Sequence, residues 1–137
     1  MLPFRLIVNA SLASFHSSRL VLIAAQLRYL DTHLHKLCVG SLPSMWGEEG
    51  AFSSLTVLFL TDNPLSGTLP AEWGGNNSWP ALQQLELGAS SSLSPPSRLS
   101  GTFPPEWGSP SAFPQLTKLL IYNTLITGKW ENALTAS

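Results

Sequence analysis

Two ten-residue strings of this chain are nearly identical, SGTLPAEWGG at 66–75 and SGTFPPEWGS at 100–109. Both belong to a longer pattern anchored on glycines at positions 40, 67, 101 and 128, which lie 27, 34 and 27 residues apart. A tryptophan follows each of the first three glycines by six residues, and a leucine follows each tryptophan by nine. Repeats with a period of about 20–50 residues are typical of solenoids and related arrays. The spacing therefore predicts a stack of similar coils.

Each of these leucines opens a second motif, in which leucines alternate with other residues. The three motifs read LTVLFLTDNPL (55–65), LQQLELGAS (82–90) and LTKLLIYNTLI (116–126). Alternation with a period of two places Leu58 and Leu60 on one face of a short strand. One coil cannot bury its own leucines, whereas stacked coils can. Asn63 is expected to turn inward and bond the backbone, and Ser90 and Thr124 occupy its column in the later coils.

The pattern L-x-x-L-x-L-x-x-N-x-L resembles the leucine-rich repeat, and the LSGTLP extension resembles its plant-type subclass. The added P-x-E-W-G resembles repeats common in green-algal and related protist proteins. The resemblance covers residues 27–128. It implies an α/β leucine-rich repeat solenoid, with a short parallel β-sheet on the concave side and turns and short 3-10 or α segments on the convex side. It also implies a receptor-like or secreted setting.

The repeat columns divide the chain into a flank, a repeat region and a tail. We expect an N-terminal flank at 1–26, the repeat region at 27–128 and a C-terminal tail at 129–137. The repeat region is expected to hold a degenerate coil at 27–54, coils at 55–81 and 82–115, and a partial coil at 116–128. A Ser- and Pro-rich loop inserted at 90–98 accounts for the longer step between repeats.

Two interpretations compete for residues 17–38. Apolar residues at steps of three and four predict a helix that Ser17 or Ser18 caps and Gly40 ends. Alternatively, the segment is a degenerate first coil, in which Leu30 takes the column of Leu58. The apolar residues of the helix pattern are Leu20, Ile23, Leu27, Leu30, Leu34 and Leu37. We favour the degenerate coil, because short apolar patterns do not separate helix from strand.

Composition and charge exclude several classes of function. The net charge of −1 and 11% charged residues leave no basic field for nucleic acid. The longest apolar run, 20–25, is far shorter than the ~20 residues of an integral membrane segment. A single cysteine, Cys38, excludes an intramolecular disulfide. The compartment stays open, extracellular or membrane-associated if the chain is receptor-like, cytoplasmic or cytoskeletal (axonemal) otherwise.

Two glutamates, Glu72 and Glu106, share a repeat column and are the nearest approach to a catalytic pair. Stacked coils would bring their carboxylates within about 5 Å, the separation of retaining glycosidases. The simpler explanation is that each lies in the first turn of a short helix started by Pro70 or Pro104. A surface pair also lacks the desolvated pocket that separates two carboxyl pKa values. We expect no catalytic residue and no enzyme activity.

Other motifs also have structural explanations. His33, His35 and Cys38 form a loose H-x-H-x-x-C without a fourth ligand, so we expect no metal site and no cofactor. Tryptophans 46, 73 and 107 would suit a sugar-stacking ladder, but their constant place favours a core on the convex side. The triplets beginning at Asn9 and Asn76 have the N-x-S form and matter only in a secreted protein.

The strand residues that face away from the leucines are the candidate partner-binding residues, since concave solenoid faces are extended binding surfaces. They are Val57, Phe59, Thr61, Asp62, Gln84, Glu86, Lys118, Leu120, Tyr122 and Asn123, with Gly88 and Ala89 beside them. Mixed apolar and polar side chains suit a protein or peptide. We therefore expect a non-enzymatic recognition module. The alternative is a spacer of a larger repeat protein or receptor, or a cytoskeletal scaffold, which contacts other repeats of a longer chain and has no ligand of its own.

Overall fold

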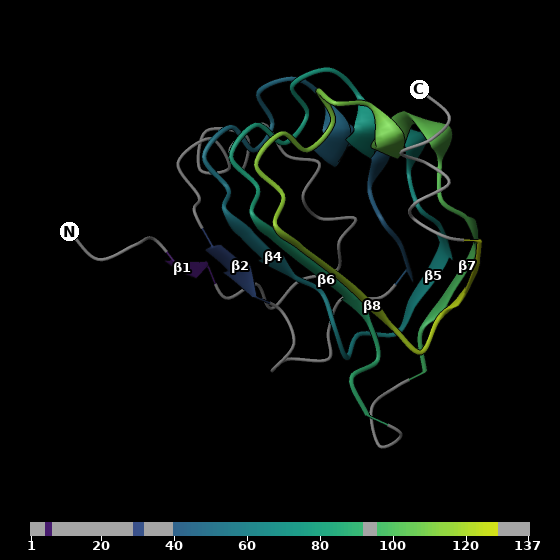
Figure 1. Ribbon diagram of the computed structural model, residues 1–137. Helices are drawn as coiled ribbons and strands as arrows, with labels where there is room; N and C mark the ends of the chain where they lie inside the picture. Colours follow the sequence, from purple (N-terminus) through teal and green to yellow (C-terminus); the bar gives the residue numbers. More distant parts are fainter. Residues whose placement is uncertain (1–4, 7–28, 32–39, 92–95, 129–137) are drawn as a thin grey trace.

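The computed structural model describes residues 5–6, 29–31, 40–91 and 96–128, and it places side chains in the last two ranges. There the chain winds into stacked coils with three sides (Figure 1). One side is a strand of a first parallel sheet, the next is a strand of a second parallel sheet, and the third is a 3-10 helix with the connection that follows it. The leucine-rich repeat solenoid expected from the sequence is confirmed.

The first sheet contains five parallel strands in the order β1-β2-β4-β6-β8. These are β1 (Arg5–Leu6), β2 (Tyr29–Asp31), β4 (Val57–Phe59), β6 (Gln84–Gly88) and β8 (Lys118–Tyr122). Equivalent repeat positions pair directly, so that Val57, Gln84 and Lys118 form one row across the sheet. Phe59, Glu86 and Leu120 form the next row. Side chains from successive coils therefore lie side by side along each row.

A second parallel sheet, which the sequence analysis did not anticipate, has the order β3-β5-β7-β9. Its strands are β3 (Gly40–Ser41), β5 (Leu65–Thr68), β7 (Arg98–Thr102) and β9 (Leu125–Thr127). The sequence separation between paired residues of neighbouring strands is two less than the repeat steps of 27, 34 and 27. It is 25 for Gly40 and Leu65, 32 for Ser66 and Arg98, and 25 for Ser100 and Leu125. The second sheet is therefore staggered by two residues per coil, whereas the first sheet is not.

Three short 3-10 helices form the third side, and the described residues contain no α-helix. They are η2 (Ser44–Gly47), η3 (Ala71–Gly74) and η4 (Pro105–Gly108). A proline in an extended conformation precedes each helix, as a fixed φ favours at a helix start. Glu72 and Glu106 lie exposed in the first turns of η3 and η4, so the helix-start explanation of these carboxylates is confirmed.

The core consists of inward leucines from both sheets. Those with 0% exposure are Leu55, Leu58, Leu60, Leu65, Leu82, Leu85, Leu87 and Leu99. The last coil differs, because Leu119, Ile121 and Ile126 are only partly buried and Leu125 is 65% exposed. Asn63 is fully buried and its Nδ2 donates to the Leu60 and Thr61 carbonyls at 3.2 and 3.1 Å, as the sequence predicts.

Aromatic side chains pack in layers beside the 3-10 helices. Trp73 lies between Trp46 and Trp107 with parallel rings, at centroid distances of 6.1 and 6.0 Å. Within each coil the tryptophan makes an edge contact with the aromatic residue six positions later, as in the pair Trp73 and Trp79. The six residues of this aromatic layer are Trp46, Phe52, Trp73, Trp79, Trp107 and Phe113, and all are buried. The tryptophan column is thus core and not a sugar-binding ladder.

The indole N–H groups of this layer also join neighbouring coils. Trp73 Nε1 donates to the carbonyl of Pro43, and Trp107 Nε1 donates to that of Pro70, both at 2.8 Å. Glycine is required at the ends of η2 and η3, because a Cβ on Gly47 would overlap the Glu72 backbone and a Cβ on Gly74 the Glu106 backbone of the next coil. The PxEWG string is therefore a coil-to-coil contact as well as a corner.

At the N-terminal side, β2 pairs with β4 and Leu30 lies opposite Leu58. Residues 29–31 are thus a strand, which the helix alternative for 17–38 does not allow at these positions. The rest of that segment, with His33, His35 and Cys38, lies outside the described residues. The whole tail at 129–137 and all of the flank except residues 5–6 also lie outside the described residues, so the domain boundaries stay predictions. In the coil at 82–115, β7 begins at Arg98, inside the segment assigned to the inserted loop.

Candidate partner-binding face

The outward side chains of β4, β6 and β8 form the surface on which the sequence placed a partner. We call it the sheet face and define it by Val57, Phe59, Gln84, Glu86, Lys118, Leu120 and Tyr122. Lys118 is exposed and the other six are partly exposed. The alternating residues Leu58 and Leu85 are fully buried. The pleat therefore separates a uniform inner face from a chemically mixed outer face.

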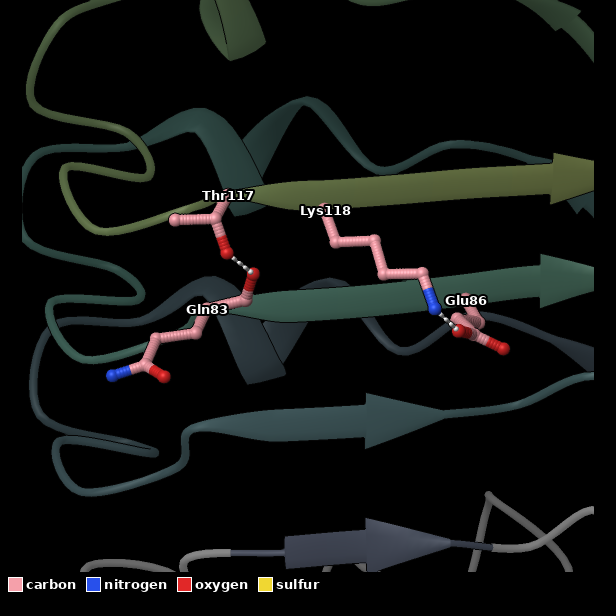
Figure 2. A network of polar contacts seen from close by, with 4 residues as sticks. All are labelled: Gln83, Glu86, Thr117 and Lys118. Carbon is pink, nitrogen blue, oxygen red and sulfur yellow. Dashed lines mark hydrogen bonds and ion pairs between the residues drawn. The ribbon is translucent and has the colours of Figure 1, made fainter.

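An ion pair crosses the sheet face diagonally. Lys118 Nζ on β8 lies 2.9 Å from Glu86 Oε1 on β6, with the two side chains 45% and 15% exposed (Figure 2). The hydrogen bond to Glu86 and the charge of Glu86 raise the pKa of Lys118 above its usual 10.5. Burial opposes this rise, and the charge of Tyr122 makes the smallest contribution, also upward. Lys118 is therefore firmly protonated at neutral pH.

The start of β8 is tied to β6 by a cluster of bonds on one carbonyl. The Gln83 carbonyl accepts the amides of Thr117 and Lys118 at 3.0 Å each and the Thr117 hydroxyl at 3.1 Å (Figure 2). In the coil before, the Thr56 carbonyl likewise accepts two amides, those of Gln83 and Gln84. These shared bonds fix the strands that present the face.

The far ends of the strands are held by two residues that the sequence assigned to partner binding. Asp62 and Asn123 have positive φ angles of 63° and 44°, conformations that Asp and Asn tolerate. The Asp62 carboxylate accepts the amide and hydroxyl of Ser90 at 2.7 and 2.6 Å. Asn123 Nδ2 donates to the Ala89 carbonyl at 2.7 Å. These hydrogen bonds account for the presence of Asp62 and Asn123 without any need for a binding partner. A binding role for the two residues stays a prediction.

Three other predicted positions lie off the open surface. Thr61 is only 6% exposed and Ala89 only 3%, because the chain bends into the second sheet here. Gly88 is buried, and a Cβ on it would overlap the Tyr122 carbonyl. The placement of Thr61 on an exposed concave face is thus corrected. Seven of the ten predicted residues, those of the sheet face, share one surface.

The diagonal ion pair was missed at the level of sequence, although both residues were named. Glu86 and Lys118 are two columns apart in adjacent coils, and side chains at such diagonal positions of neighbouring strands are within reach of each other. The opposite charges of Glu86 and Lys118 at these two columns were the sequence feature that could have predicted the ion pair. The register was needed to use it.

Within the described residues, no group of three or more His, Cys, Asp or Glu is placed to hold a metal ion. The described part of the chain also contains no helix with the length and apolar character of a membrane span. The histidines and cysteine of the H-x-H-x-x-C string lie outside it.

No protein-family model matches the sequence, and no curated protein matches it. Solved structures do match. One is the plant peptide hormone receptor RGFR1 in complex with RGF2, with 27% identity, a TM-score of 0.58 and 82% of this chain covered. Another is the leucine-rich repeat ectodomain of the Arabidopsis thaliana membrane receptor kinase GASSHO1/SCHENGEN3 in complex with CASPARIAN STRIP INTEGRITY FACTOR 2. That match has 24% identity, a TM-score of 0.63 and 96% of this chain covered, and it shows the fold alone.

This chain spans 15% of the RGFR1 chain and 14% of the GASSHO1/SCHENGEN3 chain. The likeness therefore concerns a few coils of a much longer solenoid. The repeat columns, the parallel sheets and these matches together identify the fold as a leucine-rich repeat solenoid of the type found in plant receptor ectodomains.

Proposed function

We propose that this chain is a non-enzymatic recognition module that binds a protein or peptide on its sheet face. One observation carries the proposal: positions that face inward repeat leucine, with one isoleucine at Ile121, whereas the outward positions of the same strands differ from coil to coil. Val57, Gln84 and Lys118 occupy one outward row, and Phe59, Glu86 and Leu120 occupy the next. Packing of the core does not require this variety.

The chemistry of the face suits a peptide or protein surface. Leu120 and Tyr122 are large apolar or aromatic side chains that face away from the core and stay partly exposed. Gln84 and Lys118 supply hydrogen-bond donors between the apolar groups. Central aromatic and aliphatic anchors with polar neighbours are typical of binding hot spots. Since the strands are fixed at both ends, such a face loses little conformational entropy on binding.

The solved relatives support a peptide in particular. RGFR1 is a peptide hormone receptor seen in complex with RGF2, and it shares 27% of its residues with this chain over the matched region. An extended peptide laid across β4, β6 and β8 would meet a different side chain on each strand, because the strands lie about 4.8 Å apart. The specificity for a peptide would thus depend on the sequence in which the coils present their side chains.

A selection from a display library of short random peptides tests the proposal. The full chain is immobilised and the enriched peptides are assayed against a Leu120→Ala, Tyr122→Ala double variant. We expect a loss of about 2 kcal/mol or more, roughly 30-fold in Kd, if these are central anchors. The matched control is Leu125→Ala, which truncates an exposed leucine on the second sheet. No enrichment, or equal binding by the double variant and the control, would refute the proposal.

The spacer alternative has one observation in its favour. The inward residues Leu119 and Ile121 of the last described coil are only partly buried, unlike their equivalents in the coils before. A chain whose role is to stack against other repeats would present such a surface. The same selection separates the two functions, because a spacer predicts no peptide that depends on the sheet face.

A further inference from the structure

The turn after η3 contains the N-x-S triplet Asn76-Asn77-Ser78. It spans Gly75 to Ser78, with the Ser78 amide donating to the Gly75 carbonyl at 3.4 Å. Asn77, the third residue of the turn, has a φ of 55°. Positive φ at this position favours Gly or Asn, as in type II turns. The backbone of the turn therefore explains why position 77 is asparagine.

Ser78 is explained by the packing of neighbouring coils. Its column holds alanine in the coils before and after, Ala51 and Ala112. Ser78 is 1% exposed, and its single hydroxyl proton is shared between the carbonyl of Gly47, at 2.6 Å from Oγ, and that of Glu72, at 3.1 Å. The serine thus joins two coils through a buried hydroxyl.

Asn76 is the member of the triplet that the fold does not explain. Its side chain is exposed at the corner of the turn, and it makes no hydrogen bond to any residue that the structure describes. The equivalent positions are Glu49 and Pro110, also exposed, so the column requires no asparagine. In a protein that enters the secretory pathway, an exposed, unbonded Asn in an N-x-S triplet without proline is an acceptor for N-linked oligosaccharide.

We propose that Asn76 is an N-glycosylation site of this chain. In the transfer, Nδ2 of Asn76 forms a bond to C1 of the sugar of a polyprenyl-pyrophosphate-linked oligosaccharide. The bond from C1 to the pyrophosphate oxygen breaks, polyprenyl pyrophosphate leaves with the electron pair, and the amide loses one proton. The product carries the oligosaccharide on the connection between η3 and β6, outside the strands of the sheet face.

The structure also sets the order of modification and folding. Recognition of the triplet requires the third residue as well as the asparagine. In the folded chain the Ser78 hydroxyl is buried and already bonded to two carbonyls of different coils. In a chain that enters the secretory pathway, transfer to Asn76 must therefore precede closure of the turn.

The test is secretion of the full chain from a eukaryotic cell behind a cleavable leader, in an Asn9→Gln background that leaves one triplet. Peptide mapping by mass spectrometry reads position 76 before and after peptide-N-glycosidase, which converts a glycosylated Asn to Asp. We expect the wild-type triplet and Asn77→Gly to carry the oligosaccharide. Asn77→Gly is the matched control, since it keeps both the triplet and the positive φ. Asn76→Gln and Ser78→Ala should lack it.

Two results would overturn the inference. The first is a secreted, folded chain in which residue 76 is still an unmodified asparagine. The Ser78→Thr variant, which keeps a hydroxyl at the third position of the triplet, is tested in the same way and should also be modified. The second result concerns the order of modification and folding. A chain that was folded in bacteria and then added to microsomes should stay unmodified. If it is modified, burial of the Ser78 hydroxyl does not prevent transfer, and the proposed order is wrong. Neither result bears on peptide binding by the sheet face, which has its own assay.

Discussion

The aromatic layer and the sheet face lie on two sides of the same coils, and they treat the repeat in opposite ways. In the aromatic layer, one column is tryptophan in all three coils and the next holds Phe52, Trp79 and Phe113, all of them buried. On the sheet face the row of Val57, Gln84 and Lys118 changes its chemistry at every step and stays accessible. Identical columns hold coils together, and variable columns give each coil a distinct surface.

This division follows from nearest-neighbour stacking. In a solenoid each repeat contacts only its neighbours, so stability is a sum over similar interfaces. Each aromatic side chain buries about 150–250 Å². The stacked rings and the indole bonds to Pro43 and Pro70 recur at both described interfaces between 3-10 helices. Substitutions in the aromatic layer should therefore change stability far more than substitutions on the sheet face.

Truncation of the central tryptophan should have the largest effect. Trp73 is fully buried between two parallel indoles and donates to the Pro43 carbonyl. Trp73→Ala should lower the free energy of unfolding by about 3–5 kcal/mol, the range for large aromatic deletions in cores. Urea unfolding followed by circular dichroism measures this. Leu120→Ala on the sheet face should cost far less, and equal losses in the two variants would break the contrast.

A single methyl group on the same side of the coil should have the second largest effect. Gly74→Ala puts a Cβ into the Glu106 backbone of the next coil, which is not free to move as a flexible side chain would be. Overpacking of this kind costs about 1–3 kcal/mol. Unfolding of Gly74→Ala is best compared with that of Ala71→Ser, which lies at the start of the same 3-10 helix and is partly exposed. A neutral Gly74→Ala would show that the coils are not held at this distance.

Much of this architecture could be predicted from the sequence because it depends on spacing. Tryptophans and leucines at constant intervals predict which residues share a column, and the first sheet pairs them in that register, as with Leu58 and Leu85. The conformation of Asn63 and the helix-start position of Glu72 follow from local chemistry that each residue brings with it. These features require no knowledge of how far the coils shift against one another.

The second sheet and the boundary of the binding face do depend on that shift. The segment LSGT at 65–68 has a low β-propensity and carries glycine, so it gives no strand signal of its own. It becomes a strand because the coils before and after offer paired backbone groups. In the same way, Thr61 is buried and Asp62 bonds Ser90 because of the position at which the chain bends after β4. The alternation of residues along the strand does not predict that position.

Within the aromatic layer itself, the two tryptophans of one coil should respond differently to the same substitution. Trp79 is fully buried and its Nε1 has no hydrogen-bond partner among the described residues, whereas Trp73 Nε1 is paired. An unpaired buried donor costs about 1–3 kcal/mol, so its removal offsets the loss of packing. Trp79→Phe should therefore change stability by less than about 1 kcal/mol, in either direction. Trp73→Phe loses a bond as well as volume and should cost clearly more in the same unfolding assay.

The smallest effect is expected on the sheet face, from the exposed ion pair between Lys118 and Glu86. Since Glu86 raises the pKa of Lys118 above 10.5, the Lys118 contribution to stability is complete below pH 10.5 and is lost as pH rises through the higher folded pKa. Glu86→Gln should return the Lys118 pKa toward 10.5, as NMR titration of its amine can show. The control is Glu106→Gln, an exposed carboxylate on η4 that no described cation pairs with.

The same pair predicts how stability should depend on pH. The difference in unfolding free energy between wild type and Glu86→Gln should be small, because exposed pairs are screened by water and salt. It should stay constant from neutral pH to about pH 10 and shrink above it, as Lys118 loses its proton. A difference that persists at pH values above the folded pKa would mean that Glu86 stabilises the sheet by packing rather than by charge. The sheet face would then contribute to stability much as the aromatic layer does, and the contrast between the two sides of the coil would weaken.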